Sequence, residues 1–300
     1  MNEYNLDKIN LEIPVSFGGS EKKAVAIFNN KKYLFKFPDP IREKNNDLSY
    51  MNNQFSEYVG CKIYNLLGLD AQETILGKKY FEDKGKEKIL VGCEVFTDDK
   101  NAIFEFSELL NYVNFDESSN NRDNSLENFY KILELPNIDK EAFLEQFNNM
   151  LVVDCLIANG DRHFHNIGYK LNEVTNNYEP TKIFDCGSCL CALYSDKVLN
   201  DLNNDQTLLK EKIYNLTTPY YYKNKRLLFH ELFENPDENL KSAINRIYPR
   251  INIDLINKTI DETPYISEIR RTFYKKAIQF NYENIIKNAY LRINDLKSSN

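Results

Sequence analysis

Three polar side chains between Leu151 and Leu190 have the types and spacing that phosphoryl transfer requires. Asp161 and Asn166 stand five positions apart in a loop after an apolar, helix-like run, and Asp185 opens an Asp-Cys-Gly turn after a strand-like run. Phosphoryl transfer needs a carboxylate that orients the acceptor hydroxyl and metal ions that neutralise the phosphate oxygens. Mg²⁺ prefers a few carboxylate or amide oxygens together with substrate phosphates. The pattern therefore indicates a phosphotransferase.

A metal-dependent hydrolase is an alternative for the same segment. His163 and His165 stand beside Asp161, and with Asp185 they could bind zinc or iron, because imidazole and carboxylate are ligands of both metals. Such sites usually need further histidines, and only His230 remains elsewhere in the chain. The phosphotransferase interpretation is therefore favoured.

The six cysteines lack the spacing of a secreted disulfide framework, which indicates a reducing, cytoplasmic environment. Cys186, Cys189 and Cys191 could contribute to a structural zinc site, although such a site needs a fourth ligand and usually a second pair. Small buried side chains behind the metal loop are the favoured interpretation. The polar, acidic N-terminus is unlike a signal peptide.

Length and charge limit the classes of protein to consider. A chain of 300 residues can bury a sizeable core and is near the size at which chains divide into two lobes. The net charge of −7 argues against direct binding of nucleic acid through bulk electrostatics. No apolar run is long enough to cross a membrane. We therefore expect neither nucleic acid nor membrane as a direct partner.

The N-terminal part is predicted to form a sheet with one helix. Strands are expected at residues 24–28 and 33–37 around an Asn-Asn turn, with two or three more in residues 71–97. Lys36 lies in an apolar strand, where its charge is costly unless paired. Glu57, on an amphipathic helix that ends at Gly68, is the candidate partner. The alternative places both charges in solvent.

The remainder is predicted to be mainly helical. Residues 116–127 are expected to form an exposed loop, and Asp139 is expected to cap a long helix that leads to Asp161. Residues 188–207 lack periodicity, and the tyrosines at 220–222 either pack locally, which is favoured, or line a substrate groove. Thr263-Pro264 is expected to start a helix that carries Arg270 and Arg271.

Two motifs in the central stretch resemble those of the HipA-like atypical serine/threonine kinases. Residues 159–168 read Asn-Gly-Asp-Arg-His-x-x-Asn-x-Gly, and residues 184–188 read Phe-Asp-x-Gly-Ser. The resemblance implies that Asp161 is the catalytic base and that Asn166 and Asp185 hold magnesium. It also implies that His163 is the family's motif histidine and braces the catalytic loop.

An upstream loop resembles the family's phosphate-binding loop, S-x-x-G-x-x-x-K. Ser16, Gly19 and Lys23 fall on its positions, and Gly18 provides a second glycine. Paired glycines let backbone N–H groups approach a phosphate closely. Residues 19–23 differ from the G-A-Q-x-K sequence that is common in the family, and an ordinary hairpin turn is the alternative interpretation.

Two further elements follow in the order that the resemblance implies. Lys36 matches the strand lysine, and Glu57 matches the helix glutamate within residues 52–69. The apolar strand at 89–96 falls where a kinase has its hinge, so Glu94 and Phe96 are expected beside adenine.

The resemblance therefore implies an α+β, bilobal protein-kinase-like fold. A β-rich N-lobe with one helix would span residues 1–97, and an α-helical C-lobe would span residues 98–300. ATP and Mg²⁺ are the implied cofactors, and the implied acceptor is a serine or threonine of a protein, with autophosphorylation. A kinase of a small molecule or lipid and a non-catalytic nucleotide-binding module are the alternatives.

The family also suggests partners. The chain is expected to be a short form that lacks the N-terminal subdomain of the longer toxins. An antitoxin that uses the long-form surface is then less expected, and a host protein is the other candidate partner.

Overall fold

The computed structural model describes residues 3–12, 23–38, 52–82, 85–97, 103–113 and 124–298. Contacts divide the chain into two compact units. The first unit comprises residues 1–96, 185–206 and 252–276, and the second comprises residues 97–184, 207–251 and 277–300. The first unit thus joins two later segments to the N-terminal part, and a lobe boundary after residue 97 stays a prediction.

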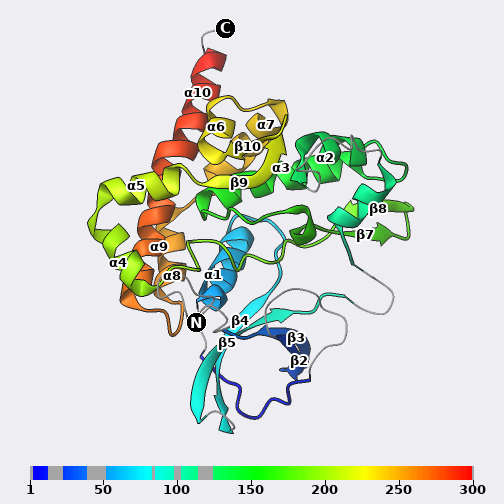
Figure 1. Cartoon of the computed structure of the whole chain (residues 1–300). Helices are drawn as coiled ribbons and strands as arrows, with labels where there is room; N and C mark the ends of the chain where they lie inside the picture. Colours follow the sequence, from blue (N-terminus) through cyan, green and yellow to red (C-terminus); the bar gives the residue numbers. More distant parts are fainter. Residues whose placement is uncertain are drawn as a thin grey trace. The chain divides into compact units, whose positions relative to one another are not determined.

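A five-stranded sheet is the framework of the first unit (Figure 1). Its strands are β1 (Tyr4–Asn5), β2 (Lys23–Phe28), β3 (Lys31–Lys36), β4 (Thr74–Phe81) and β5 (Lys86–Glu94), in the order β1-β4-β5-β3-β2. Only the β1–β4 pair is parallel. Asn29 and Asn30 join β2 to β3 with φ angles of 48° and 61°. Two positive φ values are typical of a type I′ hairpin turn, so the predicted hairpin is confirmed.

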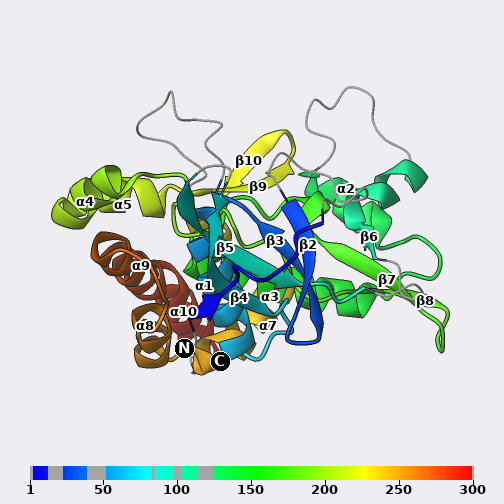
Figure 2. The ribbon, with the colours of Figure 1, turned by 90° about the horizontal axis from the view of Figure 1, so that it is seen from below.

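The core of this sheet is aromatic and aliphatic. Phe35 and Leu90 are fully buried and pack with Leu6, Ala26 and Tyr33. The strands that contribute these side chains lie side by side in Figure 2. Burial of this cluster fixes the register of β3, because a slip of one residue would turn its buried side chains to the other face.

Helix α1 (Asn53–Leu66) packs against β4 and β5. It ends where predicted, at Leu67 followed by Gly68, whose φ of 76° lies in the left-handed region that glycine adopts at helix ends. Gly60 lies inside the helix, where a Cβ atom would stand 2.7 Å from the Cβ atom of Cys186. This close approach seats the helix on the Asp185-Cys186-Gly187 turn.

The first unit also contains α4 (Asp196–Asn204), α8 (Ile253–Asp261) and most of α9 (Glu268–Asn281). Residues 188–207, which lack strong periodicity in the sequence, contain the helix α4, whose N-cap is the Ser195 hydroxyl. One expectation is wrong in this unit. Thr263-Pro264 starts no helix, because the Thr263 hydroxyl donates to the Thr259 carbonyl at the end of α8. The hydroxyl of Ser267 caps α9 by accepting from the Arg270 amide.

The second unit has small sheets and many helices. A three-stranded sheet in the order β6-β7-β8 is built from β6 (Phe104–Glu105), β7 (Gly168–Asn172) and β8 (Asn177–Pro180), and β9 (Thr217–Tyr222) pairs with β10 (Lys225–Leu228). The helices are η3 (Phe106–Tyr112), α2 (Leu126–Ile132), α3 (Lys140–Leu156), η5 (Phe164–Asn166), α5 (Gln206–Tyr214), α6 (Phe229–Glu234), α7 (Glu238–Ile247), η6 (Tyr248–Arg250), η7 (Tyr282–Ile286) and α10 (Lys287–Ser298).

Helix α3 confirms the predicted long helix, and the Asp139 carboxylate accepts from the Ala142 amide as its cap. The predicted exposed loop at 116–127 is wrong at its end, since Ser125 caps α2 and residues 126 and 127 are helical. Residues 116–123 lie outside the described part of the chain.

An aromatic cluster forms much of the core of the second unit. Phe129 stacks on Phe147 with ring centroids 4.1 Å apart, and Phe106 meets Phe164 edge-on at 5.2 Å. Phe164 lies between His163 and His165, so the cluster anchors the middle of the predicted catalytic loop.

Gly60→Ala tests the close packing of α1 against the Asp185-Cys186-Gly187 turn. An alanine inside a solvent-exposed helix is usually more stable than glycine by about 0.5–1 kcal/mol. Here the added methyl group would overlap Cys186, so we expect the free energy of unfolding to fall by about 1–3 kcal/mol. Chemical denaturation measures it. The double variant Gly60→Ala, Cys186→Gly removes the opposing Cβ atom and should recover part of the loss; a stabilised Gly60→Ala would contradict the described packing.

Candidate active site

A buried ion-pair cluster in the first unit contains three of the predicted residues. The ammonium of Lys36, the last residue of β3, lies 2.7 Å from Glu57 Oε2 and 2.8 Å from Asp185 Oδ1. The Glu57 side chain is 0% exposed, and that of Lys36 is 12% exposed. The predicted Lys36–Glu57 pair is therefore present, and the alternative of two solvated charges is wrong. The sheet and α1 together determine where this cation lies.

The second oxygen of Glu57 holds the turn that carries Asp185. Glu57 Oε1 accepts a hydrogen bond from the Cys186 amide at 3.0 Å. Asp185 itself has a φ of 57°, a conformation that aspartate tolerates better than most residues. A Cβ atom at Gly187 would lie 3.0 Å from Glu57 Oε2. Glycine after Asp185 therefore allows the carboxylate of Glu57 to approach the turn.

The cysteines of this region behave as small core side chains. Cys186 and Cys189 are buried, as the favoured interpretation predicts, whereas Cys191 is only half-buried; Cys61 of α1 is also buried. The pKa of the Cys61 thiol is raised well above its usual range, first by its contact with Cys186 and then by burial. Among the residues that the structure describes, no group of three or more His, Cys, Asp or Glu side chains has the arrangement of a metal site.

The second unit brings the other three predicted residues together in one loop. The Asp161 carbonyl accepts from the His163 amide and from the Asn166 side chain, both at 2.9 Å. His163 Nε2 lies 3.8 Å from Asp161 Oδ1 and 3.5 Å from Asn166 Nδ2. The Asp161 side chain is 53% exposed. Its carboxylate can therefore meet a ligand, while the backbone around it is tied to the Asn166 side chain.

Arg162 holds this loop from beneath, a role that the sequence did not suggest. Its side chain is 1% exposed, and Nε donates to Asp154 Oδ2 at 3.2 Å. Nη1 donates to the carbonyls of Asn166 and Phe184. A guanidinium can serve several acceptors at once, so one side chain fixes both the loop and the residue before Asp185.

Two neighbours complete the support of Arg162. Asn159 Nδ2 donates to the other oxygen of Asp154 at 2.7 Å. The hydroxyl of Tyr220, which is buried, donates to the Arg162 carbonyl. Packing is thus the correct interpretation of Tyr220. The signal in the sequence was an aspartate, Asp154, inside the apolar run that ends α3, because a buried carboxylate requires a partner.

His165, the second histidine of the alternative metal site, is engaged elsewhere. Its Nδ1 atom lies 2.6 Å from Glu105 Oε2 and 3.0 Å from the Ser107 hydroxyl. These partners come from β6 and from the 3₁₀ helix that follows it. His165 therefore connects its loop to β6 and to η3.

Only some of the residues that are predicted to bind the nucleotide lie in the described part of the chain. Ser16, Gly18 and Gly19 lie outside the described residues, whereas Lys23 lies directly opposite Lys36 in the β2–β3 pair. The two lysines therefore lie at the same end of neighbouring strands, and the charge of Lys36 is paired with Glu57 and Asp185.

The expected hinge residues lie at the end of β5 and at the end of the N-terminal segment of the first unit. The Glu94 carboxylate pairs with Lys31 at 2.8 Å, and its carbonyl accepts from Gln72 Nε2 at 2.9 Å. The contact with Glu94 raises the pKa of Lys31. Phe96 is the last residue of the N-terminal segment of the first unit. Contact of Glu94 and Phe96 with adenine stays a prediction.

Comparison with known proteins identifies the family. Residues 15–247 match the family model described as the HipA-like C-terminal domain. The chain belongs to the HipA-like family. It is 34% identical over 290 residues to the serine/threonine-protein kinase CtkA of Helicobacter pylori strain J99, an alignment that covers 93% of this chain and 85% of that protein.

Solved structures agree with this assignment. The crystal structure of the Helicobacter pylori proinflammatory kinase CtkA superposes with a TM-score of 0.88 at 32% identity, over 98% of this chain and 99% of that chain. HipA of Shewanella oneidensis MR-1, in a complex with HipB and operator DNA, matches with a TM-score of 0.55 at 15% identity, over 92% of this chain and 67% of that chain, and shows the shared fold.

These similarities confirm the predicted α+β kinase-like fold and the prediction of a HipA-type serine/threonine kinase, a phosphotransferase. In the part of the chain described here, none of the helices combines the length and the apolar character that a membrane crossing requires.

The buried Arg162–Asp154 pair makes a testable contribution to stability. Arg162→Met leaves the Asp154 carboxylate buried without its cation, so we expect the free energy of unfolding to fall by about 3–5 kcal/mol. Lys241→Met is the matched control, because Lys241 pairs with Glu238, which is 89% exposed, and such pairs contribute about 0–1 kcal/mol. Urea denaturation compares the two. Equal effects of both substitutions would contradict the described burial.

Proposed function

We propose that the chain transfers the γ-phosphate of ATP, with Mg²⁺, to serine or threonine hydroxyls of a protein. The observation that carries the proposal is the Lys36 ammonium held between the carboxylates of Glu57 and Asp185. A cation fixed in this way is suited to bind the α- and β-phosphates of a nucleotide, as the strand lysine does in kinases. Glu57 would keep Lys36 oriented when phosphates replace the contact with Asp185.

The donor atoms suit Mg²⁺. Asp185 offers carboxylate oxygens, and its side chain is 39% exposed. The nitrogen of the Asn166 amide already donates to the Asp161 carbonyl, which leaves its oxygen as the group for a metal. Mg²⁺ prefers such oxygen ligands and would neutralise charge on the transferred phosphoryl group.

Asp161 would orient the acceptor hydroxyl and take its proton. Its exposed carboxylate and its tethered backbone suit that role. His163 would position the loop through its contacts with Asp161 and Asn166. Arg162, which is buried, would act as a positioning residue and not touch the substrate.

Intact-mass analysis after incubation with Mg-ATP and a generic protein acceptor tests this function. We expect phosphate to appear on the enzyme or the acceptor with the wild type, and Asp161→Asn and Asp185→Asn to lower the rate by about 10²-fold or more. Asp254→Asn, at an exposed position on α8, should keep the wild-type rate. An active Asp161→Asn enzyme would contradict the proposed role of that carboxylate.

The kind of acceptor requires its own experiment. A protein acceptor is favoured because the curated relative is named a serine/threonine-protein kinase. A screen of proteins against small hydroxyl compounds and lipids decides it: phosphate on small compounds alone would contradict a protein kinase. Wild-type chain that binds Mg-ATP without phosphorylating anything would favour a nucleotide-binding module. A cytoplasmic location and an antitoxin or host-protein partner stay predictions of the sequence.

Ser16 is the proposed site of autophosphorylation. A phosphate group in the phosphate-binding loop would repel the phosphates of ATP and inactivate the enzyme. We expect peptide mapping of the incubated wild type to find phosphate on Ser16, and Ser16→Ala to stay active for longer in the presence of Mg-ATP. Phosphate found only on other residues would contradict this assignment.

A further inference from the structure

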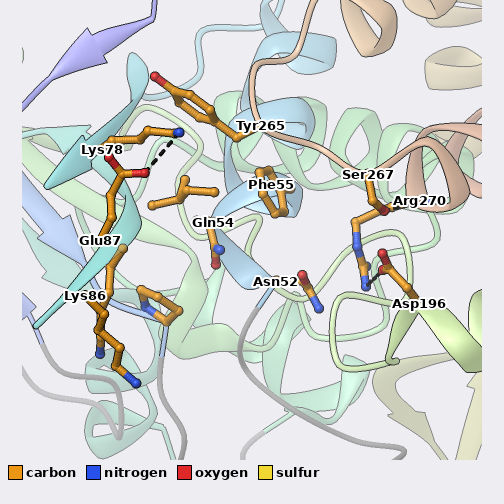
Figure 3. A pocket seen from close by; sticks show the side chains of 13 residues that line it. Asn52, Gln54, Phe55, Lys78, Lys86, Glu87, Asp196, Tyr265, Ser267 and Arg270 are labelled. Atoms are coloured by element: carbon orange, nitrogen blue, oxygen red, sulfur yellow. Dashed lines mark hydrogen bonds and ion pairs between the residues drawn. The ribbon is translucent and has the colours of Figure 1, made fainter. Parts of the chain in front are cut away.

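A pocket of about 520 Å³ lies within the first unit, apart from the Lys36 cluster. It is lined by the start of α1, by β4 and β5 and by the segment that leads into α9 (Figure 3). Its charged lining consists of four cations, Lys78, Lys86, Lys88 and Arg270, and two anions, Glu87 and Asp196. The excess of positive charge in a chain of net charge −7 indicates an anionic ligand.

Arg270 is the most informative of these residues, because it is buried with only part of its hydrogen-bonding capacity used. The side chain is 1% exposed. Its Nη2 atom donates to the Tyr194 carbonyl at 2.6 Å and to Asp196 Oδ1 at 3.0 Å. Nε and Nη1 are buried and have no acceptor in good hydrogen-bonding geometry among the residues that the structure describes. Burial raises the pKa of Tyr274, and the contact of its hydroxyl with the guanidinium opposes that rise. Buried donors without acceptors are costly, and an anion in the pocket would supply acceptors.

The N-terminus of α1 faces the same pocket. Asn52 and Gln54 line it, and Asn52, at the N-cap position, makes no capping hydrogen bond through its side chain. The first turn contains no acidic residue. The positive end of the helix dipole makes such a helix end favourable for a phosphate group. Figure 3 shows Arg270 extending towards Asp196, with Asn52 next to them.

Part of the pocket wall is apolar. Phe55, Ile89 and Tyr265 line it. The ammonium of Lys78 lies 4.8 Å from the centroid of the Tyr265 ring and 3.0 Å from Glu87 Oε1, so this lysine is already balanced. Lys86 is exposed at the pocket and adds a cation that can meet a ligand. A free phosphate ion would leave the apolar wall and most of the volume unused.

We propose that this pocket binds a phosphorylated peptide segment. The phosphoryl group would lie at Arg270, Lys86 and the start of α1, and a neighbouring apolar side chain would contact Phe55 and Tyr265. A phosphate dianion fits the arginine and the helix end better than a carboxylate, since it offers more charge and more acceptor oxygens.

The pocket is connected to the Lys36 cluster through α1. Gln54 and Phe55 line the pocket, and Glu57 in the next turn holds Lys36. Ser56 contributes a second connection, because its hydroxyl lies 2.9 Å from the Tyr274 hydroxyl and the guanidinium of Arg270 lies 5.9 Å from the Tyr274 ring centroid. A ligand at Arg270 would therefore stabilise the position of α1 that pairs Glu57 with Lys36. This regulatory effect rests on the proposed kinase function, whereas binding itself does not.

Isothermal titration calorimetry without nucleotide tests the binding. The probe is the capped dipeptide phosphoserine-phenylalanine, compared with its unphosphorylated form and with inorganic phosphate. We expect the phosphorylated probe to bind the wild type at least about tenfold more tightly than either. Lys86→Glu and Arg270→Leu should each weaken it by about tenfold or more. Lys32→Ala, at an exposed position on β3 outside the pocket, should bind like the wild type.

The outcomes separate the proposal from the proposed function. Lys86→Glu is at an exposed position, so it decides the matter even if Arg270→Leu fails to fold. Equal binding by Lys86→Glu and the wild type, or equal binding of the two peptides, would overturn the proposal. Binding of inorganic phosphate as tight as that of the peptide would replace it with a simple anion site. A Lys36→Met chain should still bind the probe, and a lower KM for ATP of the wild type with probe bound would support the connection through α1.

Discussion

The position of one positive charge governs the first unit. Lys36 is nearly buried, and an ammonium in that position is stable only with the two carboxylates that face it, Glu57 and Asp185. Each partner comes from a different part of the chain: the strand, the helix packed on the sheet and the turn more than a hundred residues later. The sheet core, the helix end at Gly68 and the glycine after Asp185 all contribute to bringing these groups together. In the proposed function, this cluster is the part of the fold that would bind the phosphates of ATP.

A second buried charge has the same effect in the second unit. Arg162 and Asp154 neutralise each other, and the remaining donors of Arg162 hold the carbonyls of Asn166 and Phe184. The exposed carboxylate of Asp161 therefore belongs to a loop whose backbone is held by the buried Arg162. Buried groups that position exposed ones are a general requirement for precise chemistry, because a loop held only by solvent contacts would not keep its geometry. The same requirement explains the aromatic cluster under Phe164.

Helix α1 links the chemistry of the first unit to a surface that the motifs do not describe. One turn of the helix carries Glu57, and the turn before it borders a cationic pocket with the buried Arg270. A buried arginine with unused donors is unusual, because the cost of its desolvation is only partly offset. A helix that borders both places would be a physical route by which a ligand in the proposed pocket could affect the proposed nucleotide site.

The sequence by itself determined the features that depend on residue type and local spacing. It identified the hairpin at Asn29-Asn30, the helix cap at Asp139, the pair Lys36–Glu57 and the family motifs around Asp161, since each is encoded within short segments or in family order. Only the tertiary structure decided the roles of Arg162 and Asp154, the burial of Arg270 and the true start of α9 after its cap, Ser267. These features depend on which side chains become buried and on which distant groups then lie within hydrogen-bonding distance. Whether a charged side chain is buried is decided by the folded chain and not by the residues next to it in the sequence.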